Sequence, residues 1–200
     1  MLGQEVIMGY ENGRAGKTGR LGEKEAIQFL DSHGYTAVKP AGKDVGVDLL
    51  INQIENPTII AKAQVKGRRQ LANPRWFQLS ITPSKIKNAW DSGEPLDSLW
   101  KNKIRMVDFW ILVSIPLNEV WVIPSDKVME IAELNSKKYS SRIDNQYEKP
   151  SYTKHGKIAK KQKELNLDIE VDGIPIWKRY IIYKNNVNSL REYFKSLKMP

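Results

Sequence analysis

A group of polar side chains in the first third of the chain has the types needed for chemistry on a phosphate ester. Asp48 stands at the start of one alternating apolar stretch, and Gln64 and Lys66 stand in the next one. Because successive side chains of a strand point to opposite faces, Gln64 and Lys66 leave their strand on one side, which Asp48 can reach from the neighbouring strand. A carboxylate, an amide oxygen and an ammonium at one sheet edge suit a divalent metal ion and a phosphate.

Hydrolysis of a phosphodiester requires stabilisation of developing negative charge, a hydroxide-like nucleophile and in-line attack. A magnesium or manganese ion on oxygen ligands meets the first two needs, and an adjacent lysine can orient or deprotonate the attacking water. In this interpretation Asp48 is the primary ligand, Gln64 adds a neutral carbonyl oxygen, and Lys66 faces the water or the phosphate. Glu23 can add a second carboxylate from a helix, although the helix dipole alone also favours an acid in a first turn.

Each of these residues also has an ordinary structural explanation. Asp48 can simply end a strand, and Gln64 with Lys66 can form a solvated strand face. The chemical interpretation therefore depends on the elements that would bring the residues together.

The required elements are a hairpin and a helix. The range 45–69 contains two alternating apolar stretches with Asn, Glu and Pro between them, which predicts a hairpin. Thr18 can cap a helix over about 19–32, which would end at His33 and Gly34.

Later apolar patterns predict a mixed sheet with further helices. The expected strands cover 76–81, 107–115 and 119–124, and the expected helices cover 84–90, 126–134 and 187–197. The segment 91–103 is interpreted as a surface connection. Alternation over 165–171 and 174–183 around Asp172 and Gly173 predicts a hairpin near the end of the chain.

The charge of the chain favours a polyanionic partner. The formal net charge is +9 with a pI near 9.5, and residues 137–163 hold nine lysine or arginine residues against two acidic ones. There is no cysteine, and two histidines are too few for a zinc site built on imidazole, so a metal here would be held by oxygen. The longest apolar run, 109–116, is too short to cross a bilayer, which predicts a cytoplasmic protein without a membrane partner.

The combined pattern resembles the PD-(D/E)XK nuclease superfamily. The motifs are Gly22-Glu23 in the first helix, the His-Gly-Tyr exit from it, Gly-Val-Asp at 46–48 and Gln-Val-Lys at 64–66. Within the superfamily the chain is most similar to Mrr-type and Holliday-junction-resolvase-related branches that carry Q-x-K. The likeness covers about residues 18–135, which include the later strands. No proline precedes Asp48, and Gln64 stands where glutamate is usual.

The resemblance implies an α/β fold with a restriction-endonuclease-like core, a mixed central sheet flanked by helices, and a C-terminal hairpin and helix added to it. It divides the chain into a flexible arm (1–17), a nuclease core (18–135) and a basic hairpin-helix extension of the same domain (136–200). It implies a catalytic set of Asp48, Gln64, Lys66 and Glu23. The implied metal ligands are Asp48, Gln64, Val65 and Glu23, and the implied ion is Mg²⁺ or Mn²⁺.

The implied function is metal-dependent cleavage of double-stranded DNA by a type II restriction-like homodimer, since a palindromic target requires a two-fold dimer. The expected DNA-binding residues are Arg68, Arg69, Arg75, Lys154, Lys157, Lys160 and Lys161. Two alternatives stay open: a structure-selective repair or recombination nuclease, and a non-catalytic DNA-binding domain with a nuclease fold, which Gln64 makes credible.

Overall fold

The computed structural model describes residues 14–41, 46–143, 150, 152–158 and 161–197. In chain order the elements are α1 (Arg14–Asp31), β1 (Tyr35–Val38), β2 (Leu49–Gln53), β3 (Asn56–Arg68), β4 (Trp76–Ile81), α2 (Pro83–Asp91), α3 (Leu96–Arg105), β5 (Phe109–Ser114), η1 (Ile115–Leu117), β6 (Glu119–Pro124), α4 (Ser125–Ile143), β7 (Lys161–Asn166), β8 (Glu170–Val171), β9 (Ile174–Pro175), α5 (Ile176–Arg179), η2 (Ile181–Tyr183) and α6 (Asn188–Ser196).

A five-stranded mixed sheet in the order β1-β2-β3-β5-β6 forms the centre of the molecule. Strand β3 runs parallel to β5, and the other neighbouring pairs are antiparallel. The connection from β3 to β5 is long because parallel neighbours need a crossover, which here contains β4, α2 and α3. Every residue of β5 is buried, which explains its continuous apolar sequence.

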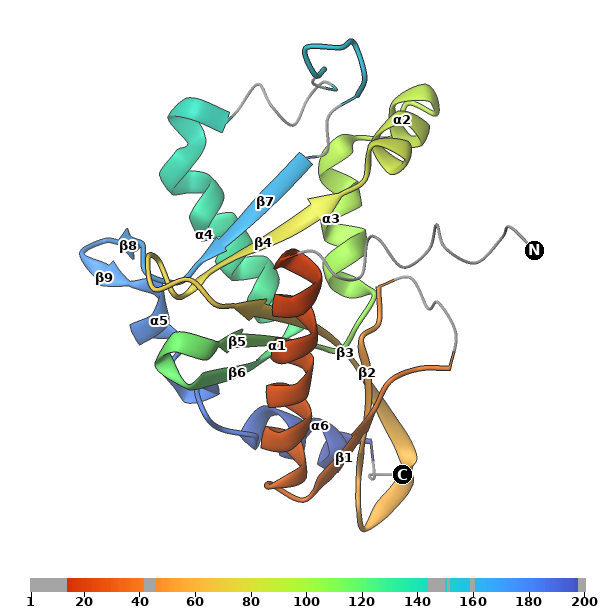
Figure 1. The fold of residues 1–200 in the computed structure, drawn as a ribbon, viewed down its shortest axis with the longest axis vertical. Coiled ribbons are helices and arrows are strands. Elements are labelled where there is room, and N and C mark those ends of the chain that lie inside the picture. The colour runs from red at the N-terminus through yellow and green to blue at the C-terminus, as the bar shows by residue number, and fades with distance from the viewer. Residues whose placement is uncertain (1–13, 42–45, 144–149, 151, 159–160, 198–200) are drawn as a thin grey trace.

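Helices cover both faces of this sheet (Figure 1). On one face α1 and α6 pack through side chains such as Leu30, Leu190 and Phe194. On the other face α3 and α4 pack against β5 and β6 through a second cluster that includes Trp100, Trp110, Trp121 and Ile131. The expected α/β fold with a mixed central sheet flanked by helices is confirmed.

Strands β4 and β7 form a separate two-stranded antiparallel ribbon, which pairs residues 76–81 with residues 161–166. Phe77, Leu79 and Ile81 alternate along β4 and are buried, as their spacing predicts. Lys161 begins β7, so part of the basic segment is a strand that pairs with residues 76–81.

Two local predictions were wrong or incomplete. The segment interpreted as a surface connection contains α3, because Leu96, Trp100 and Ile104 recur at helical spacing and are buried. The predicted hairpin near the end has its turn at Asp172 and Gly173, both with positive φ, but β8 and β9 are two residues each. The pairing stops at Pro175 because Ile176 begins α5.

The predicted helices 84–90 and 187–197 are confirmed within one residue at each end. The first helix starts earlier than predicted, at Arg14, inside the range assigned to a flexible arm, and residues 1–13 lie outside the described residues. Helix α4 runs to Ile143, well beyond the predicted end. Among the helices described, none is long and apolar enough to span a membrane.

Candidate active site

Asp48 is held at the start of β2 by the backbone of β3. Its N–H donates to the Ala63 carbonyl at 2.9 Å, and its Oδ2 accepts from the Val65 N–H at 2.8 Å. The Gln64 side chain also donates to Oδ2. Gly46, two residues before Asp48, has a φ of 112°, which a residue with a side chain rarely adopts. Glycine therefore allows the chain to turn into β2 at this point. The carboxylate therefore has a defined position with Oδ1 left for a ligand.

Gln64 and Lys66 lie on the same side of β3, as the alternation predicts. In the parallel ladder Gln64 is in register with Trp110 and Lys66 with Leu112, which belong to the cluster that packs on α3 and α4. Gln64 is 6% exposed. The ammonium of Lys66 has no hydrogen-bond partner or carboxylate at ion-pair distance within the part of the chain that the structure describes.

The surroundings of Asp48 and Lys66 disfavour the charged form of each side chain. Burial raises the pKa of the Asp48 carboxyl, the nearby Glu23 charge raises it further, and the Val65 N–H and Lys66 oppose the change. Burial lowers the pKa of the Lys66 ammonium against the attraction of Asp48 and Glu23. Because Glu23 acts on both groups, the structure brings all four predicted catalytic residues together.

Glu23 reaches the site because α1 packs unusually close to β3. A Cβ on Gly22 would lie 2.8 Å from the Gly67 Cα, and a Cβ on Gly67 would lie 2.8 Å from the Thr18 carbonyl oxygen. Two glycines at the contact allow this approach, immediately beside Glu23 and Lys66. The Glu23 carboxylate pairs with Lys39 at 2.5 Å.

The donor set fits a hard divalent cation. Asp48, Glu23, the Gln64 amide and the Val65 carbonyl offer only oxygen, which Mg²⁺ and Mn²⁺ prefer. Two carboxylates whose charges repel each other would be relieved by a cation. No group of three or more acidic or histidine side chains in ligand range occurs among the described residues, so such an ion would rely on the neutral oxygens and on water.

Lys103 is a candidate site residue that the sequence interpretation missed. It lies on α3, and its Nζ donates to the Ser80 carbonyl at 2.5 Å. Burial, together with the charges of Lys66 and Lys85, lowers its pKa to about 8, and Asp48 opposes the change. The apolar spacing of residues 96, 100 and 104 is the signal that would have predicted the helix.

The predicted DNA-binding residues fall into two groups. Arg69, Lys154 and Lys157 are exposed. The Arg68 guanidinium instead donates at 3.2 Å to the carbonyls of both Ala72 and Asn73, so it holds the loop between β3 and β4. Lys160 and the side chain of Lys161 lie outside the described residues.

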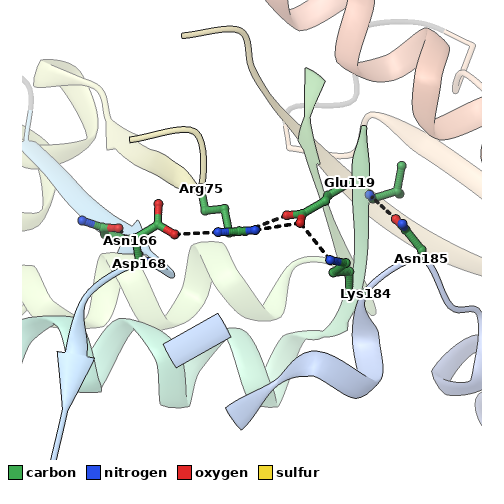
Figure 2. A network of polar contacts seen from close by, with 7 residues as sticks. Arg75, Glu119, Asn166, Asp168, Lys184 and Asn185 are labelled. Carbon is green, nitrogen blue, oxygen red and sulfur yellow. Dashed lines mark hydrogen bonds and ion pairs between the residues drawn. The ribbon is translucent and has the colours of Figure 1, made fainter. Parts of the chain in front are cut away.

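Arg75, also predicted to bind DNA, is committed to an internal network instead (Figure 2). Its guanidinium donates to Glu119 at 2.6 and 2.7 Å and to Asp168 at 3.0 Å. Lys184 donates to the same Glu119 carboxylate at 2.9 Å. With its side chain 16% exposed and two carboxylates bound, Arg75 joins β4, β6 and the end of the chain.

These interactions offset the cost of burying the charges. Burial alone would raise the pKa of Glu119, but hydrogen bonds from Arg75 and Lys184 hold it below its usual value. The hydrogen bonds that Arg75 donates to Glu119 raise the pKa of Arg75. Beside this network, Asn185 and the Val120 backbone exchange hydrogen bonds of 2.6 and 2.8 Å.

The fold is that of a nuclease-like α/β core. Among solved structures the chain is similar to that of a bacterial homing endonuclease, I-Ssp6803I, with a TM-score of 0.50 and 15% identity over 94% of this chain and 100% of the other. At this identity the likeness shows the fold alone. No family model matches the sequence, and a search of curated proteins found no match.

Proposed function

We propose that this chain is a metal-dependent DNA endonuclease of the PD-(D/E)XK type. The observation that carries the proposal is the convergence of Asp48, Gln64, Lys66 and Glu23 at one end of β2 and β3, where burial disfavours the charges of Asp48 and Lys66. The nuclease fold and the net charge of +9 support DNA as the substrate.

Each residue of the site has a role in this mechanism. Asp48, Glu23, Gln64 and the Val65 carbonyl would hold Mg²⁺ or Mn²⁺, and the ion would supply charge stabilisation and a more acidic water. Lys66 would orient the attacking water and the phosphate, because the charge of Asp48 acts on its ammonium and no described residue forms a hydrogen bond or ion pair with it. Gln64 donates to Asp48 and so keeps that carboxylate in place.

The biological role we propose is a type II restriction-like enzyme that acts in the cytoplasm as a homodimer on duplex DNA. Two copies would cut the two strands of a symmetric target. The exposed cations Arg69, Lys154 and Lys157 would contact phosphates outside the cleavage site. Binding of DNA without cleavage would favour the alternative of a non-catalytic DNA-binding domain. This alternative arises because the chain has Gln64 where a carboxylate is usual.

The test is cleavage of supercoiled plasmid with Mg²⁺ or Mn²⁺ by the wild type, Asp48→Asn and Lys66→Ala. We expect the wild type to cut and each variant to be slower by about 10³-fold or more, because both groups act on the reacting phosphate. Both variants should still bind duplex DNA in Ca²⁺, since affinity comes from many other cationic contacts. Cleavage at the wild-type rate by either variant would show that the site is misassigned.

A further inference from the structure

The last turn of α3 lies against the segment that carries Asp48. A Cβ on Gly46 would lie 3.0 Å from the Met106 Cε, so the residue after α3 contacts the chain two positions before Asp48. The Trp110 indole, in register with Gln64, donates to the Ile104 carbonyl at 3.2 Å.

Lys103 lies on the side of α3 that faces the site. Residues three apart on a helix are neighbours on one face, so Lys103 lies one turn before Met106 on the side that meets Gly46. Its side chain is half-buried, and its one hydrogen-bond partner among the described residues is the Ser80 carbonyl. An ammonium has three donors, so two remain for a ligand.

We infer that Lys103 is a second cation of the catalytic site, which binds a non-bridging oxygen of the phosphate held beside Asp48 and Lys66. This inference rests on the proposed function. Lys66 comes from β3 and Lys103 from α3, so the two ammonium groups flank the position of the phosphate from different elements. Substrate binding would place an anion between them.

The charges around Lys103 favour a ligand over a purely structural role. A half-buried lysine that served only packing would gain by pairing with a carboxylate, and no carboxylate of the described residues lies at ion-pair distance from it. Its charged neighbours include two further lysines, Lys66 and Lys85, which repel it. A phosphate would reverse this repulsion and make the depressed pKa of Lys103 rise.

The experiment compares Lys103→Met, Lys103→Gln and Lys103→Arg with the wild type and with Lys101→Met. Lys101 is the matched control because it lies on the same helix, is about half exposed and pairs with Asp97 on the surface. Gln keeps a donor for the Ser80 carbonyl without the charge, and Arg keeps the charge. The measurements are single-turnover cleavage of plasmid with Mg²⁺ or Mn²⁺, binding of a random 30-base-pair duplex in Ca²⁺ at about 50 to 200 mM salt, and thermal unfolding.

We expect Lys103→Met and Lys103→Gln to cleave about 100-fold more slowly, the usual effect of losing one donor at the reacting group. Their plots of log affinity against log salt should flatten by about 0.9. Lys103→Arg should cleave within about three-fold of the wild type, because it keeps a cation that hydrogen-bonds phosphate. Lys101→Met should match the wild type in every measurement.

The inference is overturned if both neutral variants cleave like Lys101→Met, or if Lys103→Arg loses as much activity as they do. It is also overturned if slower cleavage is matched by lower thermal stability while the salt slope is unchanged, which is the pattern of a structural role. Should Lys103→Met fail to fold, Lys103→Gln decides. If the wild type itself neither binds nor cuts DNA, the proposed function fails; if the wild type cuts and the neutral variants cut equally well, only the inference fails.

Discussion

In two clusters of polar groups in this protein, the surroundings shift the pKa values of the charged side chains in opposite directions. In the network of Arg75, Glu119, Asp168 and Lys184, hydrogen bonds hold the pKa of Glu119 below its usual value and raise that of Arg75, so the folded state favours the charged forms. At the candidate site the pKa of Asp48 is raised and that of Lys66 is lowered, so the folded state disfavours both charges.

The difference separates a cluster whose charges are paired with one another from the candidate site, whose charges are not. The network satisfies itself, and it joins β4 and β6 to the end of the chain. The site has a carboxylate oxygen and an ammonium without partners among the described residues, which agrees with the proposed binding of a cation and a phosphate. Perturbed pKa values of this kind concentrate at functional sites because the groups there are arranged for a ligand.

The largest expected effect comes from removing Glu119, the carboxylate at the centre of the network. Glu119→Ala leaves Arg75 and Lys184 without their shared carboxylate, and we expect the free energy of unfolding to fall by about 3 kcal/mol, as for other broken buried ion pairs. Asp91→Ala, which breaks the exposed pair with Lys87, should leave the free energy of unfolding close to the wild-type value, because solvent screens that pair. Urea unfolding measures both, and similar values for the two variants would contradict the stabilising role.

A second change disturbs the site without touching a charge. Gly22→Ala places a methyl group 2.8 Å from the Gly67 Cα, and we expect a loss of about 2 kcal/mol from overpacking, with slower cleavage because Glu23 and Lys66 move apart. Gly19→Ala on the same helix meets nothing within 4 Å and should gain up to about 1 kcal/mol from helix propensity. If both alanines stabilise the protein, the close packing of α1 on β3 is not needed.

The charge of Asp48 should lower the stability of the folded state, whereas the charges of the Arg75 network should not. Asp48→Asn removes a charge that burial penalises, so we expect a gain of about 1 kcal/mol in the free energy of unfolding at pH 7 together with the loss of cleavage. A destabilised Asp48→Asn would show that the carboxylate is structural.

The stability difference between Asp48→Asn and the wild type should depend on pH. The folded state raises the pKa of Asp48 above its ordinary value of 3.8, so its favourable contribution is present below that value and is lost as pH rises through the folded pKa. The advantage of Asp48→Asn should therefore vanish on acidification to about pH 3. Glu119→Gln should instead lower the free energy of unfolding at neutral pH. The lowered pKa of Glu119 stabilises the fold above pH 4.5, and that contribution is lost as pH falls through the folded pKa.

The smallest expected effect concerns the metal. Gln64→Glu adds a formal charge at a proposed ligand position, and we expect Mn²⁺ to bind about three-fold more tightly, since hard cations prefer anionic oxygen. The gain is small because the new carboxylate also loses the hydrogen bond that Gln64 donates to Asp48. Calorimetric titration measures the affinity, with Gln78→Glu on β4 as the control. Unchanged affinity would count against Gln64 as a ligand.

Local patterns in the sequence determined much of the fold and the core of the site. Alternation over 45–69 predicted β2 and β3, and a period of two was enough to place Gln64 and Lys66 on one side and Asp48 within reach. The stretches 76–81 and 119–124 were predicted for the same reason, as was the helix 187–197 from its apolar spacing.

Only the tertiary structure decided which charged residues belong to the site. Arg75 and Lys103 are both basic residues in polar stretches, and nothing local distinguishes them. The fold places two carboxylates against Arg75, from β6 and from the chain after β7. It also brings Met106, the residue after α3, against Gly46, two residues before Asp48, so that the charges of Lys66 and Asp48 act on Lys103. The role of a charge depends on the charges it meets, and those partners lie 44 and 93 residues from Arg75 in the chain, beyond the reach of any local pattern.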